Sequence, residues 1–144
     1  MYRLVILEKS AVAMSIAKAL GATVRKEGHM EGGCWLVSWC VGHLAGLADA
    51  ETYDPNYAKW RREDLPISPE NWRFTVGKGK RDQFDTLRTL LRREDVSEVV
   101  NACDAGLEGE LIFRTAYHLA GCTKPIKRLW ISSMEDGAIR EGFA

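Results

Sequence analysis

The sequence lacks any long apolar run and any secretory leader pattern. Residues 2–7 lead directly into a short β-prone segment, and no stretch approaches the roughly 20 apolar residues that a membrane-spanning helix needs. The 144 residues are 46% hydrophobic and 28% charged, which is typical of one globular domain with its own core. We therefore expect a soluble, intracellular protein with no membrane partner.

Closely spaced cysteine pairs are also missing. The four cysteines form no CxxC pair, and no His/Cys spacing suits zinc. Free thiols are typical of a reducing cytoplasm. The glycine-rich phosphate fingerprints of Rossmann and P-loop proteins are absent as well, which argues against a nucleotide-binding module.

An excess of charge of one sign is the third absence. Lys plus Arg and Asp plus Glu each number 20, so the formal net charge is zero and does not indicate a nucleic-acid binder. Basic residues do gather locally, at 59–62, 78–81 and 124–128. Such clusters can bind phosphates, although each alone is more often a solvated surface.

Strand-like and helix-like patterns alternate along the chain. Periodicity predicts helices over 11–20, 79–93 and 106–120, with Ser10 as an N-cap and Gly21 as a stop signal. A capping box at 132–135 predicts a further helix. The expected strands cover 2–7, 34–41, 72–76, 97–103 and 127–131, with a strand and loop over 22–33. This alternation predicts an α/β fold with a mostly parallel sheet flanked by helices.

Carboxylates follow two of the expected strands. Glu8 ends the first, and Asp104 ends the central one, followed by Glu108 and Glu110. Right-handed crossovers would bring these strand ends together. An acidic cluster there predicts a site for a hard cation such as Mg²⁺, although acids are also favoured at a helix N-terminus by its dipole.

The chain resembles the Toprim domain of type IA DNA topoisomerases, and most closely the bacterial topoisomerase III branch. Four segments carry the likeness in order and spacing: the opening strand, acid and helix, the Gly-His-Leu segment with its downstream prolines, the acidic motif DAGLEGE, and the segment RLWISS, at residues 4–20, 41–67, 104–110 and 128–133. The resemblance implies a Rossmann-like Toprim fold over residues 1–144, with an irregular central insertion at about 22–76. It also implies that the chain is the N-terminal part of a larger protein of the bacterial cytoplasm or nucleoid.

The same resemblance implies an enzyme that cuts one DNA strand through a 5′-phosphotyrosine, passes another strand and reseals the first. Its partners would be single-stranded DNA and the remaining domains of the polypeptide, and its cofactor Mg²⁺. Glu8 would be a catalytic acid and metal ligand, and Lys9 would offset charge on the phosphate. Asp104 and Glu108 would be metal ligands, and Glu110 an acid just outside them.

Two positions depart from the family pattern. Gly106 replaces the second aspartate of the acidic motif, and Leu107 replaces the usual arginine, so the site loses one carboxylate and one cation. None of the four tyrosines lies in the family's active-site tyrosine motif. We therefore expect this fragment to supply the acidic metal site without the nucleophile, and to be inactive alone.

Weaker interpretations concern other residues. His43, Arg61 and Arg62 are candidate DNA contacts, although a histidine in a tight loop often bonds the backbone instead. The five tryptophans are expected mainly in the core. Two alternatives to a topoisomerase remain: another Toprim enzyme, nuclease or primase-like, or a non-catalytic α/β nucleic-acid-binding module.

Overall fold

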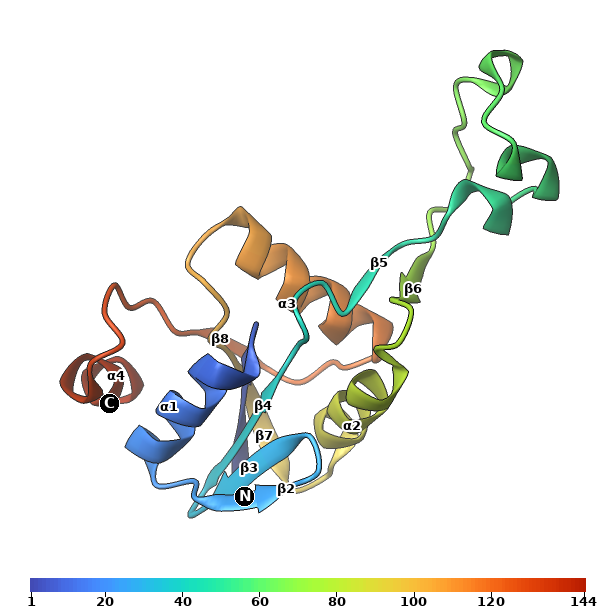
Figure 1. Cartoon of the computed structure of the whole chain (residues 1–144). Coiled ribbons are helices and arrows are strands. Elements are labelled where there is room, and N and C mark those ends of the chain that lie inside the picture. Colours follow the sequence, from blue (N-terminus) through green and yellow to red (C-terminus); the bar gives the residue numbers. More distant parts are fainter.

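A six-stranded sheet forms the centre of the computed structural model, which describes residues 1–144 (Figure 1). Its order is β2-β3-β4-β1-β7-β8. Strands β4, β1, β7 and β8 run parallel, whereas β2 and β3 form an antiparallel hairpin at one edge. The strand bounds are Tyr2–Leu7 (β1), Val24–Lys26 (β2), His29–Gly32 (β3), Trp35–Trp39 (β4), Val96–Asn101 (β7) and Ile126–Arg128 (β8). The predicted mostly parallel α/β architecture is confirmed.

Helices cover both faces of this sheet (Figure 1). Leu4 and Ile6 of β1 pack with α2 (Arg81–Arg92) and α3 (Leu107–Leu119), while Val5 and Leu7 pack with α1 (Ser10–Leu20) and α4 (Asp136–Phe143). Successive residues of a strand point to opposite faces, so a strand buried on both sides must be apolar throughout. The helical spacing of four apolar residues in the sequence predicts the inner face of α2, and all four are buried: Phe84, Leu87, Leu90 and Leu91.

The caps of two helices differ from the sequence predictions. Ser10 lies inside α1, whose N-cap is Lys9 without a side-chain cap, so the Ser10 N-cap is wrong. The sequence predicts one apolar face of this helix, made of Val12, Ile16, Ala19 and Leu20. Of these only Ile16 is fully buried, and the other three pack at the edge of the core. The remaining fully buried positions of α1 are Ala13 and Ala17. Gly21 does end the helix, in the left-handed conformation that glycine adopts without strain.

The predicted capping box at residues 132–135 does not form. Helix α4 begins at Asp136, its N-cap is Glu135, and no side chain caps it. The Ser133 hydroxyl instead accepts a hydrogen bond from the Glu135 amide. A serine just before a helix competes for such local turns, so the pattern alone did not locate the first helical residue.

A narrow arm projects from the sheet (Figure 1). Strands β5 (Ala45–Leu47) and β6 (Phe74–Val76) pair antiparallel at its base. Three 3₁₀ helices occupy its tip: η1 (Ala50–Thr52), η2 (Pro55–Ala58) and η3 (Arg62–Asp64). Of the segment 22–76 expected as an insertion, residues 24–39 supply three strands of the main sheet, and the part that leaves the sheet is residues 45–76.

The tryptophans divide between the sheet and the surface. Trp35 and Trp39 of β4 are half-buried against the core. Trp60, Trp72 and Trp130 are 84%, 58% and 72% exposed, so the prediction of a core position is wrong for these three. Trp60 and Trp72 belong to the arm, which has little apolar interior in which a side chain could be buried. None of the helices combines the length and apolarity needed to cross a bilayer.

Candidate acidic site at the carboxyl edge of the sheet

The carboxyl ends of β1, β4 and β7 meet at one edge of the sheet because the three strands are adjacent and parallel. Backbone hydrogen bonds join the loops that leave them. The Cys40 amide donates to the Leu7 carbonyl at 2.7 Å, and the Ala102 amide donates to the Ile6 carbonyl at 2.9 Å. Glu8, His43 and Asp104 therefore emerge at the same edge, where ligands bind in open α/β sheets.

The three carboxylates predicted as metal ligands have different surroundings. Glu8 lies 3.3 Å from the Lys9 ammonium and is largely covered. Oε1 of Glu108, in the first turn of α3, lies 3.1 Å from Nε2 of His43. The Asp104 side chain is exposed and has no hydrogen-bond or ion-pair partner. No three such side chains converge closely enough to enclose a metal ion by themselves.

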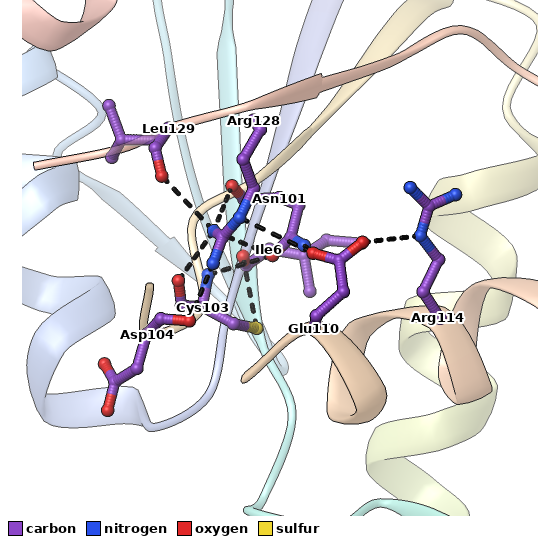
Figure 2. A network of polar contacts seen from close by, with 8 residues as sticks. All are labelled: Ile6, Asn101, Cys103, Asp104, Glu110, Arg114, Arg128 and Leu129. Carbon is purple, nitrogen blue, oxygen red and sulfur yellow. Dashed lines mark hydrogen bonds and ion pairs between the residues drawn. The ribbon is translucent and has the colours of Figure 1, made fainter. Parts of the chain in front are cut away.

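Glu110 is held by side chains rather than open to solvent. Its Oε2 accepts a hydrogen bond from the side-chain amide (Nδ2) of Asn101 at 2.8 Å and lies 3.5 Å from Nε of Arg128. Its Oε1 accepts a hydrogen bond from Nε of Arg114 at 2.7 Å. Both carboxylate oxygens are thus engaged, in contrast to the free carboxylate of Asp104 (Figure 2).

Arg128 is absent from the site residues that the sequence predicts, yet it contacts more of the acidic loop than any of them. Its Nη1 donates to the main-chain carbonyls of Asn101 at 2.9 Å and Cys103 at 2.7 Å. Its Nη2 donates to the carbonyl of Asp104 at 2.6 Å. The guanidinium therefore binds the backbone of the loop that follows β7 (Figure 2). In the sequence it belongs to the basic cluster at 124–128, which is read as solvated.

Gly109 is a second residue that the sequence does not single out. It is buried in the first turns of α3, where a Cβ would come within 2.2 Å of the Asp104 carbonyl oxygen. Only glycine permits this approach of the helix to the acidic loop. A glycine inside a helix costs about 1 kcal/mol relative to alanine, which is the one sequence signal that could have pointed to it.

A buried thiol, that of Cys103, directly precedes the acidic loop. Cys103 precedes Asp104, and its thiol lies 3.8 Å from the Ile6 carbonyl oxygen. A hydrogen bond with Cys40 and burial together raise the pKa of the Cys103 thiol, so the group stays uncharged. All four cysteines are free, as the sequence predicts.

The remaining predicted residues are cations at exposed positions. Lys9 is beside Glu8, but its side chain is 68% exposed. Arg61 and Arg62 are exposed on the arm, where Arg61 forms an ion pair with Asp64 at 3.0 Å. The arm extends away from the sheet, so these two arginines are not brought to the acidic edge (Figure 1).

Comparison with known proteins identifies the family. The model of the Toprim domain matches residues 3–134. The chain belongs to the Toprim domain family. It is 48% identical over 140 residues to the DNA topoisomerase 3 of Bacillus thuringiensis (strain Al Hakam), and 45% identical over 139 residues to that of Bacillus subtilis (strain 168). The alignments cover 97% and 96% of this chain and 19% of each relative, so this Toprim domain spans about a fifth of their length.

The solved structure of full-length topoisomerase I from Thermotoga maritima has the same fold. It superimposes with a TM-score of 0.63 over 97% of this chain and 20% of that chain, at 21% sequence identity. Together with the family match, this confirms the Toprim fold that the sequence motifs predicted. The likeness to topoisomerase 3 relatives is likewise confirmed.

Proposed function

We propose that residues 1–144 are the Toprim domain of a larger type IA, topoisomerase III-like enzyme, which cleaves, passes and reseals single DNA strands with Mg²⁺. The observation that carries the proposal is the adjacency of β1 and β7, which puts Glu8 at the same edge as Asp104 and Glu108. The similarity to two topoisomerase 3 proteins over nearly the whole chain supports it. The proposal therefore includes DNA as the substrate and Mg²⁺ as the cofactor.

The donor set fits a magnesium ion by its chemistry. Mg²⁺ prefers oxygen ligands and is usually held by one or two carboxylates together with waters and substrate phosphates, so a preformed cage is not required. Asp104 offers a carboxylate without any partner, and Glu108 is engaged only by His43 at an exposed position. When bound, such a cation would stabilise negative charge on the oxygens of a phosphodiester.

The neighbouring residues would have separate roles. Glu8, largely covered and directly after β1, would hold or transfer a proton beside the scissile phosphate. The Lys9 ammonium would offset phosphate charge, and Glu110, already held by two arginines, would act only from outside the ligand set. His43 would face the DNA from the loop after β4, and Arg61 and Arg62 would contact DNA only where a strand reaches the arm.

No tyrosine of this chain is placed to act as the nucleophile. The hydroxyls of Tyr2 and Tyr117 donate to Glu31 and to the Lys124 carbonyl, both at 2.7 Å. Burial raises the pKa of Tyr117, which makes it a poorer nucleophile. Tyr53 and Tyr57 are on the arm. The attacking tyrosine would therefore come from the rest of the polypeptide, and this chain alone would not cleave DNA.

The test is an amide NMR titration of the 144-residue chain with Mg²⁺, repeated with a short single-stranded oligonucleotide that can supply phosphate ligands. We expect shifts confined to Glu8 and residues 104–108, which disappear in Asp104→Asn. The matched control is Asp95→Asn, which changes an exposed aspartate at the opposite end of β7. Shifts that survive in Asp104→Asn, or their absence at millimolar Mg²⁺ with and without DNA, would contradict the proposal.

A further inference from the structure

We propose that Arg128 is a positioning residue, which holds the loop after β7 so that the Asp104 carboxylate is directed toward the cation. The inference about the cation rests on the proposed function. The inference about the loop rests only on the contacts of Arg128, and the two parts are tested separately.

The contacts of Arg128 are concentrated on one short segment. The guanidinium donates to the carbonyls of Asn101, Cys103 and Asp104 at distances of 2.6 to 2.9 Å. A planar guanidinium presents several donors in a fixed fork, so it can bind several carbonyls at once, whereas a lysine ammonium is a compact point charge. Three main-chain carbonyls of residues 101–104 are therefore bound by one side chain from the neighbouring strand β8.

Arg128 also links this loop to helix α3. Its Nε lies 3.5 Å from Oε2 of Glu110, and the side-chain amide (Nδ2) of Asn101 donates to the same oxygen at 2.8 Å. Glu110 and Glu108 share the first turn of α3. One guanidinium thus connects the segment that carries Asp104 with the helix end that carries Glu108.

The guanidinium binds Asp104 through its main chain and not through its carboxylate. In Figure 2 the Asp104 carboxylate points away from Arg128, and it has no hydrogen-bond or ion-pair partner. An arginine paired with that carboxylate would compete with a cation, whereas this arrangement leaves the acid free and holds the backbone from which it extends. This difference distinguishes a positioning role from charge neutralisation.

The experiment compares Arg128→Ala and Arg128→Lys with the unchanged 144-residue chain. The control is Arg114→Ala, which removes the other arginine partner of Glu110 but no contact with the loop. The first readout needs no metal: amide shifts and hydrogen exchange of residues 102–106. We expect large changes there in Arg128→Ala, with the β1 amides unchanged, and little change in Arg114→Ala.

The second readout is the Kd for Mn²⁺, used as the probe ion. Mutation of a residue that orients metal ligands typically weakens metal affinity by about 10- to 100-fold. We expect a loss of that size in Arg128→Ala but not in Arg114→Ala. Arg128→Lys should recover only part of it, because the donors of an ammonium all lie on one nitrogen, whereas the three carbonyls are bound by two separate nitrogens of the guanidinium. Added guanidinium ions should restore the affinity of Arg128→Ala and leave Arg114→Ala unchanged.

The outcomes separate the two proposals. Unchanged loop amides in Arg128→Ala would overturn the positioning role, and altered amides with an unchanged Mn²⁺ affinity would overturn its relevance to the cation. If the unchanged chain binds no metal, the proposed function fails while the loop amides still decide the role of Arg128. If Arg128→Ala does not fold, Arg128→Lys decides: unchanged loop amides and affinity in that variant overturn the inference.

Discussion

Gly109 packs directly against the main chain of Asp104. A Cβ at position 109 would come within 2.2 Å of the Asp104 carbonyl oxygen and 2.8 Å of its amide nitrogen. Both obstacles are backbone atoms, which cannot rotate away as the end of a side chain could. The start of α3 therefore approaches the acidic loop more closely than any residue with a Cβ would permit. This close approach keeps Glu108 and Asp104 at the same edge.

Gly109→Ala should therefore displace the acidic loop. Forcing an extra methyl into a well-packed site typically costs about 1–3 kcal/mol, and we expect a loss of that size in the free energy of unfolding. Urea denaturation measures it. The control is Gly137→Ala in the first turn of α4, where nothing lies within 4 Å of the added methyl and stability should hold or rise slightly. Equal stability of the two variants would show that the loop yields freely.

Gly106→Asp should strengthen cation binding. Gly106 has an extended backbone, with φ −170° and ψ 177°, and no heavy atom lies within 4 Å of a Cβ there. An aspartate therefore fits without strain and adds a carboxylate next to Asp104, and affinity for hard cations rises with the charge of the ligand set. We expect the Kd for Mg²⁺ to fall. Gly106→Asn has the same shape without the charge, so equal affinities of the two variants would exclude the carboxylate as the cause.

The sheet and α2 could be predicted because their signals are local and strong. The continuous apolar run of β1 indicates a strand buried on both faces, and the spacing of Phe84, Leu87 and Leu91 matches one face of a helix. The placement of the strand ends before Glu8 and Asp104 at one edge of the sheet followed from handedness rules for parallel strands. These inferences required no knowledge of particular side-chain contacts.

The role of Arg128 could not be predicted in the same way. The carbonyls that it binds in the loop lie 24 to 27 positions earlier in the chain, so only the folded arrangement of β7 and β8 reveals them. A single sequence presents the same arginine as one of several surface cations. The exposure of Trp60 and Trp72 was missed for a related reason: the sequence predicts an irregular insertion there but does not show that it projects away from the sheet.

Glu98→Gln should make stability less dependent on acid pH. Glu98 lies on β7 between Arg3 of β1 and Lys127 of β8. Burial raises the pKa of its carboxyl, but hydrogen bonds from Lys127, at 3.1 Å, and from Arg3 outweigh it and leave the pKa lowered. A lowered folded-state pKa contributes stability above the unfolded value, about 4.3, and loses it as the pH falls through the folded value.

We therefore expect Glu98→Gln to lower the free energy of unfolding by about 1 kcal/mol at pH 7, and the gap to the unchanged chain to close below about pH 4. Urea unfolding at several pH values measures this. Glu94→Gln is the control, because Glu94 is exposed and has no hydrogen-bond or ion-pair partner. A gap that stays constant down to acid pH would mean that the glutamine changes packing rather than charge.

Truncation of Trp35 should destabilise the chain much more than truncation of Trp60. The Trp35 ring meets Phe143 edge-on at 5.1 Å and carries the Arg3 guanidinium at 4.5 Å from its centroid, so Trp35→Ala should cost about 3 kcal/mol by removing packed area and two ring contacts. Trp60 is 84% exposed on the arm, so Trp60→Ala should stay within about 0.5 kcal/mol of the unchanged chain in urea denaturation. A large loss in Trp60→Ala would mean that the arm folds back onto apolar surface, because an exposed ring has no packing to lose.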